Sequence, residues 1–137
     1  MKNFVIDCSS TLSLFIPDED NRKYKDKIFK LFKDARCVVP SIWLYEVNNV
    51  LLSCLKRGRL EKQQTHKIIE SLSRLSVEIE DSNITSLHND TYDLAFKNNL
   101  SFYDASYVNT AIRNKSSLAT LDKKLAACAV KLNIEVI

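Results

Sequence analysis

The stretch FVID at residues 4–7 places three apolar residues in a row and ends them with an acid. An apolar run without polar alternation is typical of a strand that is covered on both faces of a parallel sheet. Comparable runs occur at 37–39 and 117–119, whereas 77–80 and 134–137 alternate apolar residues with glutamate. The five runs therefore predict three inner strands and two edge strands, and the glutamates of the edge strands are expected to be solvated.

Segments of helical period separate these runs. Apolar residues recur at helical spacing over residues 22–33, 43–55, 61–75, 84–96 and 102–113. Alternation of strands and helices predicts an α/β fold with a parallel sheet. Short right-handed crossovers then give a five-stranded sheet in the order 3-2-1-4-5, flanked by helices. The length of 137 residues fits one domain over residues 1–137 with one core.

The composition excludes several classes of protein. With a single glycine among 137 residues, the chain cannot form a glycine-rich phosphate loop. No apolar run reaches the roughly 18 residues of a membrane span, and the first residues do not resemble a signal peptide, so we expect a cytoplasmic protein. The net charge of +3 slightly favours an anionic partner. The cysteines form no CxxC pair and are read as small buried hydrophobes: Cys8, Cys37, Cys54 and Cys128.

Acidic residues gather around the expected inner strands. Asp7 ends the first strand, and Asp122 directly follows the fourth. Asp104 begins the helix that leads into the fourth strand, and Glu46 lies in the second turn of the helix after the second strand. In the expected strand order the direction of winding reverses between the first and fourth strands, where open α/β sheets bind ligands. We therefore expect these four carboxylates to meet at one crevice.

Each of these acids also has a plain structural explanation. Asp7 and Asp122 could cap the helices that follow them, and Ser101 with Asp104 fits a capping box. Glu46 could be a surface residue. Helical spacing supports the crevice, because Asp104 lies along the apolar stripe of its helix rather than opposite to it.

Converging carboxylates need a cation. Two of them about 4 Å apart repel by about 4 kcal/mol at an effective dielectric constant near 20. No histidine or cysteine accompanies them in the pattern, so the donors would all be oxygen atoms. An all-oxygen site selects Mg²⁺ or Mn²⁺ over zinc.

The motifs at residues 4–9, 40–51, 100–105 and 120–122 resemble, in order and spacing, those of PIN-domain ribonucleases. The resemblance is strongest to the VapC-type toxins of prokaryotic toxin–antitoxin pairs. It implies a 3-2-1-4-5 sheet, a divalent-metal-dependent endoribonuclease, frequent homodimers and an antitoxin protein that blocks the site. By motif match, the metal-binding and catalytic roles fall to Asp7, Glu46, Asp104 and Asp122, and supporting roles fall to Ser9, Asn49 and Thr120.

Contacts with an RNA substrate require basic residues near the acids. The residues nearest to them in the expected fold are Arg113, Lys115, Lys123 and Lys124. The leading alternative is a PIN-fold module that binds RNA or a protein without catalysis. A receiver-like phosphorylation domain is a weaker alternative, because it would place a pair of acids after the first strand, where Asp7 stands alone.

Overall fold

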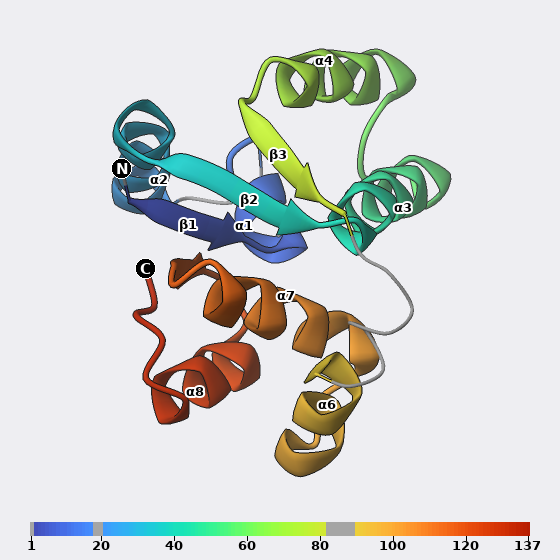
Figure 1. Cartoon of the computed structure of the whole chain (residues 1–137). Coiled ribbons are helices and arrows are strands. Elements are labelled where there is room, and N and C mark those ends of the chain that lie inside the picture. Colours follow the sequence, from blue (N-terminus) through green and yellow to red (C-terminus); the bar gives the residue numbers. More distant parts are fainter. Residues whose placement is uncertain (1, 18–20, 82–89) are drawn as a thin grey trace.

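The structure is a computed structural model that describes residues 2–17, 21–81 and 90–137. Within these residues, four parallel strands form one sheet in the order β3-β2-β1-β4 (Figure 1). The strands are β1 (Asn3–Ile6), β2 (Arg36–Pro40), β3 (Val77–Glu80) and β4 (Ser117–Ala119). The helices around them are α1 (Cys8–Ser13), α2 (Arg22–Asp34), α3 (Ile42–Lys56), α4 (Lys62–Ser73), α6 (Tyr92–Asn98), α7 (Phe102–Arg113) and α8 (Lys123–Lys131).

The prediction of an α/β fold with a parallel sheet is confirmed, but the fifth strand is wrong. The segment 134–137 approaches the outer edge of β4, as the order 3-2-1-4-5 requires, yet it forms only one bridge, between Leu118 and Val136. Two backbone hydrogen bonds hold it: Leu118 N–H donates to the Glu135 carbonyl at 2.9 Å, and Ile137 N–H donates to the Leu118 carbonyl at 3.0 Å. The pairing is confined to this single bridge, so the segment is not a fifth strand of the sheet.

The core forms on both faces of the sheet. Phe4 and Val5 are adjacent in β1 and both are fully buried, and successive strand side chains point to opposite faces. Phe4 packs edge-to-face against Phe32 of α2, with ring centroids 5.1 Å apart. α7 packs against β2, β1 and β4. Each such buried side chain contributes about 1.5–3 kcal/mol to folding, so the inner strands are fixed firmly.

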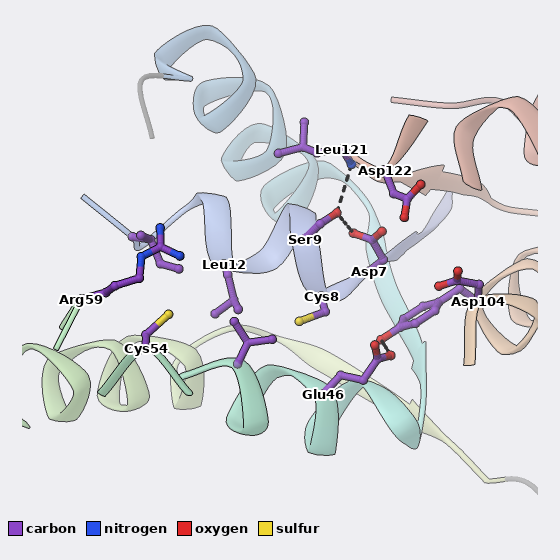
Figure 2. Close-up of a pocket in the computed structure, with 13 residues that line it drawn as sticks. Asp7, Cys8, Ser9, Leu12, Glu46, Cys54, Arg59, Asp104, Leu121 and Asp122 are labelled. Atoms are coloured by element: carbon purple, nitrogen blue, oxygen red, sulfur yellow. Dashed lines mark hydrogen bonds between the residues drawn. The ribbon is translucent and has the colours of Figure 1, made fainter. Parts of the chain in front are cut away.

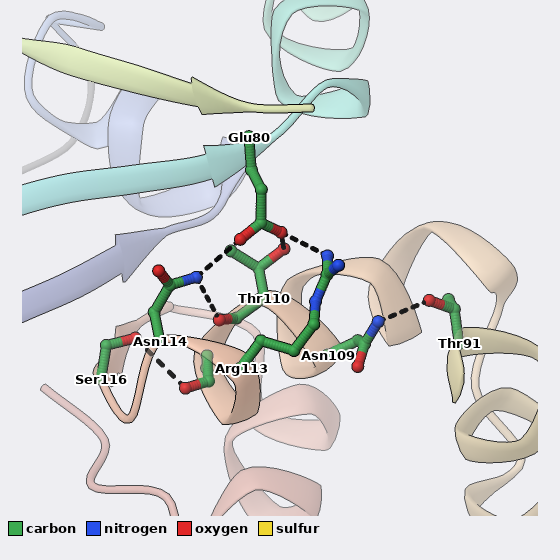
Figure 3. Close-up of polar contacts among 8 residues, drawn as sticks. Glu80, Thr91, Asn109, Thr110, Arg113, Asn114 and Ser116 are labelled. Carbon is green, nitrogen blue, oxygen red and sulfur yellow. Dashed lines mark hydrogen bonds and ion pairs between the residues drawn. The ribbon is translucent and has the colours of Figure 1, made fainter. Parts of the chain in front are cut away.

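Glu80 at the end of β3 is not solvated, contrary to the expectation for an edge strand. Its carboxylate accepts hydrogen bonds from Thr110 Oγ1 at 3.3 Å and Asn114 Nδ2 at 2.8 Å, and it forms an ion pair with Arg113 (Figure 3). These groups lie in or just after the last turn of α7. These contacts of Glu80 hold the end of α7 against the edge strand β3. Glu78, in contrast, is half-exposed and pairs with Arg36.

Three further expectations can be compared with the structure. The helix expected over residues 84–96 begins outside the described residues, and residues 92–96 of it fall in α6. Cys37, Cys54 and Cys128 are buried, as the sequence predicts, whereas Cys8 is half-buried. Among the helices that the structure describes, none combines the length and apolar character needed to cross a bilayer.

Candidate active site

A cavity of about 470 Å³ lies at the carboxyl ends of the inner strands (Figure 2). Part of its wall comes from Cys8 and Ser9 at the start of α1 and from Leu121 and Asp122, which lie between β4 and α8. All four acids singled out from the sequence line it: Asp7, Glu46, Asp104 and Asp122. Residues separated by more than one hundred positions thus contribute carboxylates to one cavity.

Asp7 is the most enclosed of these acids, with 5% of its surface exposed. Its Oδ1 accepts hydrogen bonds from Ser9 Oγ and from the Ser10 backbone N–H, both at 2.8 Å. Its Oδ2 accepts a hydrogen bond from Thr120 Oγ1. The bond from Ser10 makes Asp7 the N-cap of α1, so capping fixes the orientation of the carboxylate at the cavity wall.

Asp122 is held by the same cluster. Its backbone N–H donates to Thr120 Oγ1 at 3.0 Å, and its Oδ1 accepts a hydrogen bond from the Leu125 N–H at 3.1 Å, which caps α8. Ser9 Oγ in turn accepts a hydrogen bond from the Leu121 N–H at 3.2 Å. The hydroxyls of Ser9 and Thr120 therefore join the start of α1 to the junction between β4 and α8.

Glu46 has a partner that sequence reasoning missed. The Tyr107 hydroxyl donates a hydrogen bond to Glu46 Oε1 at 2.8 Å. Only 1% of the surface of Tyr107 is exposed. A signal exists in the sequence, because Tyr107 follows Asp104 by three residues on the same helix face, and a buried tyrosine hydroxyl requires a polar partner. The tyrosine positions the Glu46 carboxylate from the opposite helix.

Asp104 sits in the first turn of α7. The Ser101 hydroxyl accepts a hydrogen bond from the Asp104 N–H at 3.0 Å and caps this helix. The Asp104 side chain is half-buried and faces the cavity beside Asp122 (Figure 2). The helix N-terminus favours a negative charge at this position.

Burial and mutual repulsion both disfavour the charged forms of these acids. Burial is the largest cause that raises the pKa of Asp7, and the charge of Asp122 raises it further, against the opposing hydrogen bonds from Thr120, Ser10 and Ser9. Burial also raises the pKa of Glu46, with smaller effects from Asp104 and Asp7. The pKa of Asp104 is raised first by burial and then by the charge of Asp122. In all three acids the neighbouring groups therefore stabilise the carboxylate form less than water does.

Cys8 lines the cavity but is poorly suited to act as a nucleophile. Burial, followed by the charges of Glu46 and Asp7, raises the pKa of its thiol to about 12. The reactive thiolate is therefore scarce at neutral pH.

Of the remaining residues predicted from the sequence, some lie near the acids and others do not. Lys123 and Lys124 are exposed in the first turn of α8, and the charge of Lys124 reaches Asp104, whose pKa it lowers. Asn49 is exposed on α3 and is not among the described residues that line the cavity. Arg113 ends α7 at the Glu80 ion pair, and Lys115 lies just beyond, beside a different cavity near the start of β4. The structure does not bring these last two residues to the acids.

The donor set of the cavity suits a hard cation, since four carboxylates supply oxygen atoms only. Within the described ranges, however, no three acidic, histidine or cysteine side chains lie close enough together to form a ready-made metal-binding group. The acids thus face a common space without converging on a single point.

The chain has a parallel α/β sheet and a carboxylate-lined cavity at its strand ends. It therefore belongs to the α/β proteins whose ligand site is built from acidic side chains. The family follows from comparison with known sequences: the profile of the PIN domain matches residues 4–131. The chain belongs to the PIN domain family, and the resemblance drawn from its motifs is confirmed.

Similar proteins share this fold over most of their length. Ribonuclease VapC3 of Pyrobaculum aerophilum is 26% identical over 122 residues, which cover 89% of this chain and 91% of the relative. Among solved structures, VapBC2 from Rickettsia felis, bound to a DNA fragment from their promoter, aligns with a TM-score of 0.67 and 14% identity over 98% of this chain and 97% of that chain. VapC20 of Mycobacterium tuberculosis, a sarcin-ricin loop cleaving toxin, aligns with a TM-score of 0.62 and 12% identity over 90% of this chain and 93% of that one.

Proposed function

We propose that this chain is a divalent-metal-dependent endoribonuclease that hydrolyses RNA phosphodiester bonds and acts as the toxin of a toxin–antitoxin pair. The observation that carries the proposal is the gathering of four acids of a PIN domain around one cavity. The names of a ribonuclease relative and of an RNA-cleaving structural neighbour support it. We further propose that residues 1–137 form a single domain of this kind.

The chain's own residues divide the work. Asp7 and Asp104 would ligate Mg²⁺ or Mn²⁺, Asp122 would ligate directly or through water, and Glu46 would ligate or orient the attacking water. Such cations keep several water ligands and need only one or two carboxylates, which agrees with the absence of a tight three-residue cluster among the described residues. When bound, the cation would lower the pKa of water and stabilise charge on the phosphate. Ser9, Thr120 and Tyr107 hold the carboxylates in place.

Basic residues would bind the RNA backbone beside this centre. Lys123 and Lys124 are the best placed of those chosen from the sequence, because both are exposed directly after Asp122. We retain a contact of Arg113 or Lys115 with a distant part of the RNA only as a prediction, because both lie at the other end of α7 from Asp104.

Partners follow from the same proposal. One solved neighbour is a toxin–antitoxin complex from Klebsiella pneumoniae, which aligns with a TM-score of 0.62 and 18% identity. We therefore propose a cognate antitoxin protein as a partner, together with a homodimer, and a cytoplasmic location where RNA and antitoxin meet.

The test is incubation of the purified protein with total RNA in Mn²⁺ or in EDTA, followed by mapping of the cut ends. We expect cleavage in Mn²⁺, none in EDTA, and none with Asp7→Asn or Asp104→Asn. Asp34→Asn is the matched control, because Asp34 is an exposed acid at the end of α2; it should cleave like the wild type. Cleavage that persists in both site variants would refute the assignment.

A non-catalytic PIN-fold module that binds RNA or a protein is the second candidate. This candidate predicts RNA binding without cleavage and no rise of the melting temperature in Mn²⁺. A catalytic site predicts a Mn²⁺-dependent rise, because a ligand that binds only the folded state stabilises it.

A further inference from the structure

The cavity has two chemically different ends. Figure 2 shows the acids at one end and the guanidinium of Arg59 at the other. Between them lies an apolar floor and wall made by Leu12, Ile16, Val50 and Cys54. From the sequence alone, Arg59 is expected further out from the acids than Lys123 and Lys124, because the nearest of them, Glu46, lies thirteen positions before it.

The backbone around Arg59 is well fixed. α3 ends at Lys56, and Gly58 turns the chain with a φ of 72°, a conformation that glycine adopts without strain. The Arg59 N–H then donates to the Cys54 carbonyl at 2.9 Å, and the next residue, Leu60, is buried. This helix-terminating turn directs the side chain of Arg59 back toward the cavity.

The charges that line the cavity indicate what the end with Arg59 can bind. Its described lining holds four acids and a single basic residue, Arg59. An RNA strand that enters carries one phosphate per nucleotide, and the acid end can accept only the phosphate that a cation neutralises. Lys123 and Lys124 can bind phosphates outside the cavity on the side of Asp122, so a phosphate that lies toward the other end of the cavity needs a positive partner there. A guanidinium suits it, because its planar fork donates two parallel hydrogen bonds to phosphate oxygens.

We propose that Arg59 binds the phosphate adjacent to the one that is cleaved, with the intervening ribose and base lying over the apolar floor of the cavity. Arg59 is thus a substrate-binding residue that sets the register of the RNA strand. This inference rests on the proposed ribonuclease function. It adds to that function one specific contact between the protein and the RNA.

The test compares three variants on a short fluorescein-labelled single-stranded RNA. Arg59→Gln removes the charge, Arg59→Lys keeps the charge without the fork, and Arg57→Gln is the matched control. Arg57 is exposed two residues away at the end of α3 and does not line the cavity in the described structure. Cleavage kinetics are measured in Mn²⁺, and binding is measured by fluorescence anisotropy in an Asp7→Asn background over a range of salt concentrations.

For Arg59→Gln we expect KM and Kd to rise about tenfold with kcat within about twofold, while Arg59→Lys is intermediate. The slope of log binding constant against log salt should fall by about 0.7, the value for one contact with a single-stranded phosphate. Arg57→Gln should change KM by less than about twofold. Equal effects of Arg57→Gln and Arg59→Gln, or an unchanged KM and salt slope for Arg59→Gln, would overturn the inference.

The outcome that would refute the proposed ribonuclease function differs from the outcome that would refute only the role of Arg59. If the wild type does not cleave RNA in Mn²⁺, the nuclease assignment falls. If the wild type cleaves and Asp7→Asn does not, while Arg59→Gln behaves like the control with an unchanged melting temperature, only the role of Arg59 is lost.

Discussion

Replacing Thr120 with valine tests the structural centre of the site. Its hydroxyl donates to Asp7 Oδ2 and accepts a hydrogen bond from the Asp122 N–H at 3.0 Å. Thr120 and Asp7 are each only 5% exposed, so water cannot readily replace the lost bond to Asp7. Valine has nearly the same shape as threonine, and Thr120→Val therefore removes the two hydrogen bonds while leaving the packing almost unchanged.

The expected loss of stability can be estimated from these contacts. A hydrogen bond to a charged acceptor contributes about 1.5–3 kcal/mol, and the loss of the bond from the partly exposed Asp122 N–H adds about 0.5–1 kcal/mol. Thr120→Val should therefore lower the free energy of unfolding by about 2–4 kcal/mol. At about 4 °C per kcal/mol for a domain of this size, the melting temperature should fall by about 8–16 °C.

The loss should also depend on pH in a defined direction. The hydrogen bond from Thr120 stabilises ionised Asp7 and so lowers its pKa, against the larger effect of burial, which raises it. Thr120→Val raises the folded-state pKa of Asp7 further. The destabilisation is therefore complete above that pKa and shrinks as the pH falls and Asp7 takes up a proton in both proteins.

The assay is urea unfolding followed by circular dichroism, at neutral and at acidic pH, without metal and with Mn²⁺. Thr110→Val is the matched control, because Thr110 is a buried threonine that donates to Glu80 at 3.3 Å, away from the cavity. It should lose less stability and keep the full stabilisation by Mn²⁺, whereas Thr120→Val should lose part of it. A loss below about 0.5 kcal/mol at neutral pH, or one that is the same at acidic pH, would refute the reasoning.

Two further variants test the electrostatics of the cavity. Asp104→Asn should raise the metal-free stability by a few tenths to about 1 kcal/mol, after allowance for solvent screening of this half-buried group, because burial and the charge of Asp122 raise the pKa of Asp104. The gain should grow as the pH rises from about 4, and a loss in EDTA at neutral pH would contradict it. Tyr107→Phe should lower the stability by about 1–2 kcal/mol through its lost bond to Glu46. Combined with Glu46→Gln in a double-mutant cycle, it should give a coupling energy near 1 kcal/mol, and additive effects would show that the two side chains do not interact.

The inner part of the fold was predictable because burial leaves a clear mark on sequence. Runs without polar residues, as in β1 and β2, occur where both faces are covered, and the order β3-β2-β1-β4 follows from them. Edge positions are less constrained. The alternation of residues 134–137 resembles a strand, yet the segment forms a single bridge to β4. The partners of Glu80 depend on which groups α7 presents to it.

The positions of the acids were predictable for the same reason, whereas their partners were not. An acid that follows a buried strand within a few residues lies at the carboxyl edge of the sheet. This places Asp7, directly after β1, and Asp122, three residues beyond the end of β4, at that edge. Tyr107 and Arg59 depend on the rotation of a helix and on the direction of a turn, which periodicity alone does not fix. Arg113 shows the opposite error: it is close in sequence to β4, but nine residues of helix place it about 14 Å along α7 from Asp104.

Capping and the proposed catalytic role are not competing explanations for these acids. A carboxylate has two oxygen atoms and about four lone-pair sites, so Asp122 can accept the Leu125 N–H at Oδ1 and still present its other oxygen to the cavity. In a parallel sheet the strands end where helices begin, so caps and cavity necessarily share an edge. Each helix N-terminus stabilises a nearby negative charge by about 0.3–1 kcal/mol. The caps therefore offset part of the repulsion among the acids, and they let the protein fold with its carboxylates already gathered before any cation is bound.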